Sequence, residues 1–133
     1  MLLEKEGILN VKFSGMNIHV LKGKIHRATV TDASLDYEGS LGIDRAFLKQ
    51  SGILPYERIL VGNISNGNRF ETYVIPEPEG SKTICLNGAV AHLGAVGDLL
   101  VIMAFCEIPA EQGAGWVPKT ITLSEKNSKV TIQ

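Results

Sequence analysis

The sequence predicts a small, mainly β protein that folds as a compact barrel with few short helices. Short apolar or alternating segments recur along the chain, and glycine-containing turns separate them. Helical patterns are short and rare between these segments. The chain has 133 residues, of which 44% are hydrophobic. That length accommodates one hydrophobic core and is too short for two ordinary domains.

Strand-like segments open the central part of the chain. Residues 26–31 alternate polar and β-branched side chains, as a half-buried strand does. Residues 31–34 (Thr-Asp-Ala-Ser) carry side chains that cap turns and helices, so we expect a turn or a short helix there. A second short extended segment is predicted after it, and Ser40 follows that segment closely.

A short helix is predicted next, from Asp44 to Gly52. The Asp44 carboxylate can cap the free amides of the first turn, and Gly52 can end the helix in a left-handed conformation. Phe47 and Leu48 are expected to face inward. Pro55 then begins a new segment.

A β-hairpin is predicted from residues 58–63 and 70–75. The turn between them contains Asn66-Gly67, the pair best suited to positive φ at both central positions. Residues 83–86 and 99–107 are predicted to be further buried strands, separated by a segment of small residues.

The two ends of the chain differ from the central domain, which we place at residues 16–117. Residues 1–15 are predicted to be an N-terminal extension, non-native or disordered, with Met16 as a candidate start. The alternative is a genuine extra strand, because residues 8–13 alternate in part. Residues 118–133 are predicted to form a polar, mobile C-terminal tail.

Charge and composition exclude several classes of function. The 13 basic and 14 acidic residues give a net charge of −1, which provides no broad attraction to nucleic acid or to an anionic membrane. No apolar run approaches the roughly 20 residues that a bilayer-spanning helix needs. We expect a soluble protein without nucleic-acid or membrane partners.

The cysteines predict neither a metal site nor a disulfide. Cys85 and Cys106 lie in apolar runs, where a buried free thiol is the usual explanation. The chain has no CxxC or Cys/His spacing and no export signal, so a metal site and a disulfide framework are not expected. We expect a reducing, cytoplasmic compartment.

The dipeptide Gly39-Ser40 is the most informative feature for function. A serine hydroxyl can attack the carbonyl that precedes it, and a glycine there allows close approach and a strained backbone. Most Gly-Ser pairs are ordinary turns, so the dipeptide carries weight only with its neighbours. These are Lys24-Ile25-His26-Arg27, Tyr37-Glu38, Asn66-Gly67-Asn68-Arg69-Phe70-Glu71-Thr72-Tyr73, Asn87-Gly88-Ala89-Val90-Ala91-His92 and Val96-Gly97-Asp98.

In order and spacing these motifs resemble the aspartate 1-decarboxylase family, over about residues 21–116. The resemblance implies a double-psi β-barrel and a homotetramer with active sites between subunits. It also implies decarboxylation of L-aspartate to β-alanine and CO2 for pantothenate and coenzyme A synthesis. The chain would be a proenzyme that cuts itself between Gly39 and Ser40. Ser40 would become a covalent pyruvoyl cofactor, whose ketone forms a Schiff base with the substrate amine.

The resemblance also implies roles for individual residues. Arg69 is the best candidate for holding a substrate carboxylate, because its planar fork can donate two parallel hydrogen bonds. Lys24 supplies a second cation, and two cations suit a substrate with two carboxylates. Which carboxylate each one binds stays open.

Further residues match the family's catalytic and processing positions. Tyr73 matches the tyrosine that reprotonates the substrate carbon. Thr72 matches a threonine that acts in self-cleavage, although a regular strand places it on the face opposite Tyr73. Tyr37 is interpreted as a helper of processing. Asn87, Gly88 and Ala89 resemble the segment that lines the pyruvoyl pocket; His26 matches a histidine near the site, and His92 is interpreted as structural.

One position departs from the family, and two alternatives stay open. The family often carries a tryptophan where this chain has Gly62, which puts the shape of one pocket wall in doubt. The chain could instead be an uncleaved β-barrel that binds a ligand or partner without catalysis. Pyruvoyl chemistry on another substrate, such as glutamate, is the second alternative. Whether cleavage needs a maturation factor stays open too.

Overall fold

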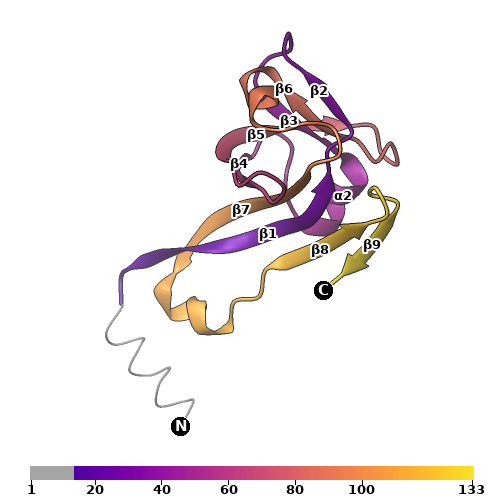
Figure 1. Cartoon of the computed structure of the whole chain (residues 1–133). Coiled ribbons are helices and arrows are strands. Elements are labelled where there is room, and N and C mark those ends of the chain that lie inside the picture. Colours follow the sequence, from indigo (N-terminus) through magenta and orange to yellow (C-terminus); the bar gives the residue numbers. More distant parts are fainter. Residues whose placement is uncertain (1–13) are drawn as a thin grey trace.

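The computed structural model describes residues 14–133, so the predicted extension at residues 1–15, with its alternative strand at 8–13, falls almost wholly outside the described residues. The described chain is mainly β, as predicted, with nine strands, one α-helix and two short 3-10 helices (Figure 1). The elements are β1 (Asn17–Thr29), β2 (Asp32–Ser34), β3 (Ser40–Asp44), α2 (Arg45–Ser51), β4 (Arg58–Asn63), β5 (Arg69–Glu77), β6 (Ile84–Asn87), a 3-10 helix (Gly88–Leu93), β7 (Leu99–Pro109), a second 3-10 helix (Ala110–Gly115), β8 (Lys119–Ser124) and β9 (Lys129–Ile132).

The strands form one mixed sheet in the order β2-β6-β3-β5-β4-β7-β1-β8-β9. The pairs β1–β8, β2–β6 and β3–β5 are parallel, and the other neighbours are antiparallel. This mixed, crossed-over arrangement is consistent with a double-psi β-barrel. Within residues 14–133, β2 and β9 are the outer strands of the order and do not pair to close it.

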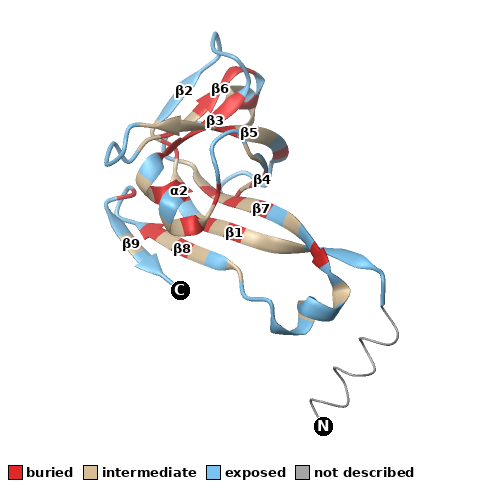
Figure 2. Cartoon of the chain, turned by 180° about the vertical axis from the view of Figure 1, so that it is seen from behind, coloured by how far each residue is buried: buried red, intermediate tan, exposed pale blue. Residues whose placement is uncertain are grey.

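The core lies on one face of this sheet. Ile25, Ile102, Val61 and Phe70 are buried register partners across β1, β7, β4 and β5. In Figure 2 the buried positions follow β3 and gather where α2 meets the sheet. Full burial of such side chains stabilises the fold by about 1.5–3 kcal/mol each. We call the opposite side of these strands, which carries Lys24, Leu60, Arg69, Tyr73 and Met103, the outer face.

The predicted helix is confirmed as α2. The Asp44 carboxylate accepts a hydrogen bond from the Ala46 amide at 2.8 Å, and Gly52 ends the helix at φ 73°. The same carboxylate accepts from the amides of Gly80 and Lys82 at 3.0 and 2.7 Å, so it also fastens the loop after β5.

Within residues 14–133, no helix has the length and apolar character that a membrane crossing requires.

The predicted hairpin is confirmed as β4 and β5, but its turn differs from the prediction. Gly67 has φ 81°, whereas Asn66 does not adopt a positive φ. The connection is longer than a two-residue turn because the Asn63 side chain organises it, accepting from the amides of Ser65 and Asn66 at 2.9 and 3.3 Å.

Two local predictions are wrong. Residues 32–34 form strand β2, parallel to β6, instead of a turn or short helix, because they add to the edge of a sheet that the local pattern does not reveal. Residues 119–132 are not a mobile tail. Strand β8 pairs in parallel with β1 and buries Ile121 and Leu123, and β9 pairs with β8.

A buried polar side chain, Asn127, adds to the attachment of the C-terminal hairpin. Its Oδ1 accepts from the Thr29 amide at 2.8 Å, and its Nδ2 donates to the carbonyls of Thr29 and Lys82 at 2.8 and 3.1 Å. Asn127 is 1% exposed and has φ 67°. Asparagine tolerates this left-handed conformation better than most residues.

Candidate active site

Ser40 is the first residue of β3, and its side chain is completely buried. The Ser40 hydroxyl donates to the Glu38 carbonyl at 3.2 Å and accepts from Nδ2 of Asn87 at 3.0 Å. Gly39, immediately before it, is exposed. The predicted cleavage bond therefore joins an exposed loop to a strand whose first hydroxyl is held in place.

Gly88 packs directly against the backbone of this loop. It has φ 67°, and a Cβ placed there would lie 2.6 Å from the Tyr37 carbonyl oxygen and 2.7 Å from the Gly39 nitrogen. No side chain fits at such distances. The predicted need for a small residue at this position has a steric cause, which is the close approach of the segment around Gly39.

Register brings Asn87, Ser40 and Tyr73 together on three neighbouring strands. Ser40 is opposite Asn87 in the antiparallel pair of β3 and β6. Leu41 is opposite Val74 in the parallel pair of β3 and β5, so the residues that precede them, Ser40 and Tyr73, share the face away from the core. Neighbouring strands lie about 4.8 Å apart, which makes Tyr73 the nearest weak acid on β5 to Ser40.

The other predicted processing and pocket residues are distributed less compactly. Thr72 is opposite the buried Ile59, on the core side of β5, because the strand is regular there. Tyr37 is 54% exposed in the loop before Ser40, and Ala89 is exposed at the start of the 3-10 helix. His92 is exposed at the end of the same helix. The chain by itself does not bring Thr72 to the face of Ser40.

Both predicted substrate-binding cations lie on the outer face, on strands far apart in the sheet. Arg69 begins β5 and Lys24 lies in β1, and three strand spacings, about 14 Å, separate these strands. Arg69 also precedes Tyr73 by four residues, about 13 Å along β5. Register partners form rows across β1, β7, β4 and β5. The row of Arg69 contains Gly62, Val101 and His26. The next row contains Lys24, Met103, Leu60 and Glu71, so the two cations lie in neighbouring rows.

The charges on this face differ in their partners. Arg58 forms an ion pair with Glu71, with Nε 3.1 Å from the carboxylate, whereas Arg69 makes no ion pair within residues 14–133. Burial lowers the pKa of His26, and Lys24 and Arg27 lower it further, so its imidazole is neutral at neutral pH. Of these two arginines, Arg69 on β5 is the one without an ion pair among the described residues, so it can bind an anion supplied from outside the described chain.

Gly62 leaves the wall beside Arg69 without a side chain. The two residues are register partners on β4 and β5, and their Cβ directions lie on the same face. A Cβ at Gly62 would lie 3.1 Å from Cγ1 of Val101, so a larger residue would require Val101 to shift. The departure from the family pattern therefore falls in the row that contains Arg69 and His26.

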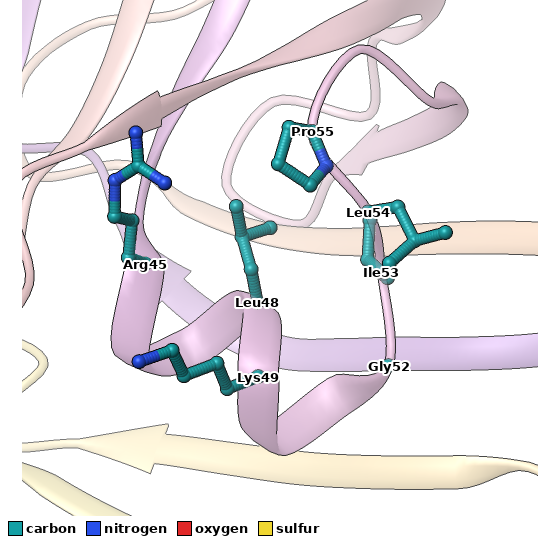
Figure 3. Close-up of a pocket in the computed structure, with 7 residues that line it drawn as sticks. All are labelled: Arg45, Leu48, Lys49, Gly52, Ile53, Leu54 and Pro55. Atoms are coloured by element: carbon teal, nitrogen blue, oxygen red, sulfur yellow. The ribbon is translucent and has the colours of Figure 1, made fainter.

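Two surface cavities are present in the described structure, one on the outer face and one beside α2. One, of about 430 Å³, is lined by His19, Arg58, Ile59, Leu60, Glu71 and Phe105. The other, of about 230 Å³, lies between α2 and the segment after it, where Leu48 points toward Pro55 and the side chains of Arg45 and Lys49 lie on the opposite side of Leu48 (Figure 3). Neither is lined by Ser40, Lys24, Arg69 or Tyr73.

Sequence reasoning missed one residue of the site. Cys85 was interpreted only as a buried free thiol, but it is half-buried and its Sγ donates to Oδ1 of Asn87 at 3.1 Å. Burial raises the pKa of the Cys85 thiol, and Asp32 and Glu77 raise it further. The available signal was the spacing of Cys85 and Asn87. Asn87 directly follows the predicted strand at residues 83–86, and the structure extends that strand to Asn87, which puts the two residues on one face.

Comparison with known proteins agrees with these features. The family model described as aspartate decarboxylase matches residues 16–130. A relative from Caulobacter vibrioides, named aspartate 1-decarboxylase, is 51% identical over 112 residues, which cover 84% of this chain and 95% of the relative. Relatives of the same name from Caldicellulosiruptor saccharolyticus and Campylobacter jejuni subsp. doylei are 50% and 49% identical over 117 residues, covering 88% of this chain and 91% and 92% of theirs. With a family model that matches most of its length and relatives that share about half of its residues, the chain belongs to the aspartate decarboxylase family.

Proposed function

We propose that this protein decarboxylates L-aspartate to β-alanine and CO2 and so supplies the synthesis of pantothenate and coenzyme A. The observation that supports it best is the arrangement at Ser40. Its buried hydroxyl is held by Asn87, and Gly88 packs against the segment that ends in Gly39. Family membership gives the substrate class, and the two outer-face cations suit a dicarboxylate.

The cofactor would come from the chain itself. The Ser40 oxygen attacks the Gly39 carbonyl carbon, and the peptide becomes an ester with a free amine on residue 40. Elimination then breaks the Cβ–O bond and releases residues 1–39 with a C-terminal carboxylate. The dehydroalanine left at position 40 takes up one water and releases one ammonia, which leaves a pyruvoyl group. The residues present fit this processing, because a Cβ at Gly88 would collide with the backbone of Tyr37 and Gly39, and Nδ2 of Asn87 holds the serine oxygen that attacks.

The pyruvoyl ketone would supply the electron sink that amino acid decarboxylation requires. The chain's own residues would bind and orient the substrate around it. Arg69 and Lys24 would hold the two carboxylates of aspartate. The Tyr73 hydroxyl, on the strand next to Ser40, would donate a proton to the substrate carbon after CO2 leaves. Thr72 and Tyr37 would assist processing, and Ala89 would line the pocket with Asn87 and Gly88.

We further propose a homotetramer whose active sites lie between subunits. The separation of Lys24 from β5, about 14 Å within one sheet, supports this assembly. A neighbouring subunit can present its own Lys24 or Arg69 to Ser40 and complete the site, and closed symmetry then repeats the exchange. The two free cysteines fit a reducing, cytoplasmic compartment.

The activity is tested by product analysis of the purified protein. With L-aspartate we expect stoichiometric β-alanine and CO2, and with L-glutamate little or no 4-aminobutyrate. Ser40→Ala should fold and release no product, because the cofactor precursor is gone. Borohydride with aspartate should attach substrate to the fragment that begins at residue 40. An active Ser40→Ala variant would refute the pyruvoyl mechanism, and an uncut, inactive wild type would favour a binding module.

A further inference from the structure

A chain of three hydrogen bonds ends on the Ser40 hydroxyl. The Cys85 thiol donates to Oδ1 of Asn87 at 3.1 Å, and Nδ2 of Asn87 donates to the Ser40 oxygen at 3.0 Å. The Ser40 hydroxyl then donates to the Glu38 carbonyl at 3.2 Å. All three hydrogen bonds are donated in the same direction, from the Cys85 thiol toward the Glu38 carbonyl. The orientation of the Asn87 amide therefore decides whether the Ser40 hydroxyl meets a donor or an acceptor.

The Asn87 amide can present either of its two ends to Ser40, with opposite consequences. In the observed orientation the NH2 occupies one lone pair of the Ser40 oxygen, and the hydroxyl proton points to Glu38. The second lone pair stays free to attack the Gly39 carbonyl. With the amide reversed, its oxygen would accept the hydroxyl proton instead and rotate the hydroxyl away from Glu38.

The surroundings of Cys85 keep it a donor. In the sheet Cys85 is the register partner of Asp32 on β2 and of Gly42 on β3. The Glu77 carboxylate covers Gly42, since a Cβ on Gly42 would lie 2.7 Å from its Oε1. Two carboxylates therefore flank the thiol. Burial raises the pKa of the thiol, the carboxylates of Asp32 and Glu77 raise it further, and both effects favour the protonated thiol.

We propose that Cys85 is a positioning residue, which acts through Asn87 to hold the Ser40 hydroxyl for its attack on Gly39. A protonated thiol donates to the amide oxygen and is only a weak acceptor for an amide NH2, so it favours the amide orientation that directs Nδ2 at Ser40. The inference rests on the proposed self-cleavage and deepens it. Cys85 itself contacts neither the substrate nor the reacting carbonyl.

The test follows self-cleavage after synthesis in a cell-free reaction that is then stopped, with intact mass reporting the uncut fraction over time. Cys85→Ala removes the donor and should slow cleavage about three- to tenfold, the effect of one neutral hydrogen bond. Cys85→Ser restores a donor and should return the rate to within about twofold of wild type. Cys106→Ala, the same change at a half-buried thiol on β7, is the matched control and should cleave like wild type.

A double-mutant cycle distinguishes positioning from a general structural effect. If Cys85 acts through Asn87, adding Cys85→Ala to Asn87→Ala should slow cleavage no further, and thermal midpoints of Cys85→Ala and Cys106→Ala should agree. If Asn87→Ala leaves no measurable cleavage, the cleavage rates of Cys85→Ala and Cys85→Ser decide whether Cys85 acts as a hydrogen-bond donor. Two results would overturn the role of Cys85 and leave the proposed function standing. One is cleavage of Cys85→Ala at the rate of Cys106→Ala, and the other is cleavage that is slowed equally in Cys85→Ala and Cys85→Ser. An uncut wild type would overturn the proposed function, and the inference with it.

Discussion

At the scale of single residues, Gly88 carries the tightest steric constraint near the cleavage bond. A Cβ there would lie within 2.8 Å of three backbone atoms of Tyr37 and Gly39. We predict that Gly88→Ala slows self-cleavage roughly tenfold or more, because the loop must shift and the positive φ adds strain of about 1–3 kcal/mol. Intact mass over time measures the rate.

Gly80→Ala is the matched control for this change. Gly80 also has a positive φ, of 84°, but a Cβ there would meet nothing within 4 Å. It should therefore carry the backbone strain without the collision and cleave near the wild-type rate. Equal rates for Gly88→Ala and Gly80→Ala would show that contact with the loop does not control processing.

Arg69 is predicted to act in turnover and not in processing. Arg69→Lys keeps the charge but loses the planar fork, so we expect normal cleavage and a kcat/KM for aspartate about 10- to 100-fold lower, which corresponds to about 1.5–3 kcal/mol. Steady-state kinetics on the cleaved enzyme measure it. Arg45→Lys, at the exposed start of α2, is the control. Wild-type kinetics in Arg69→Lys would rule out the carboxylate role.

The site residues could be named from the sequence, but their arrangement could not. The motifs identified Ser40, Asn87 and Tyr73, whereas their shared row depends on how β3 pairs with β5 and β6. Cys85 escaped notice because its role depends on the orientation of a neighbouring amide. Thr72 shows the converse, since a regular strand keeps it on the core side within one chain, so its motif role would require a site shared between subunits or a distorted strand.

At the scale of helices and strands, the sequence predicted the features that depend on residues close together in the chain. The bounds of α2 followed from Asp44 and Gly52, because caps act within one helical turn. The strands β8 and β9 were not predicted, because residues 118–133 are polar on average. Residues 119–124 nevertheless alternate between polar and apolar side chains, as a strand does. The partner of β8 is β1, far earlier in the chain, and such pairing leaves no local trace.

The C-terminal hairpin provides a test at this scale. Asn127→Ala should lower the free energy of unfolding by about 2–4 kcal/mol, because buried backbone groups of Thr29 and Lys82 lose their partners. Urea denaturation at fixed protein concentration measures the loss. Lys126→Ala, beside it at φ 54° and exposed, should change stability little. Equal stability of both variants would contradict the role given to Asn127.

At the scale of the whole molecule, the distance between Lys24 and β5 predicts that two chains build each site. Co-expressing Ser40→Ala, which lacks the cofactor precursor, with Lys24→Ala, which lacks one cation, should restore part of the decarboxylase activity. Each variant alone should be inactive or nearly so. Light scattering should report a tetramer. A strictly monomeric active species would refute the assembly, and a tetramer without restored activity would place both groups in one chain.

If Ser40 becomes the cofactor by cutting the chain, the intact mass of the purified wild-type protein must show it. We expect two fragments, residues 1–39 and residues 40–133, with the second lighter by one ammonia than a chain that begins with serine. Ser40→Ala should give a single 133-residue chain. A wild-type protein that decarboxylates aspartate while its chain is still whole, or whose second fragment keeps an ordinary serine, would rule out Ser40 as the cofactor precursor.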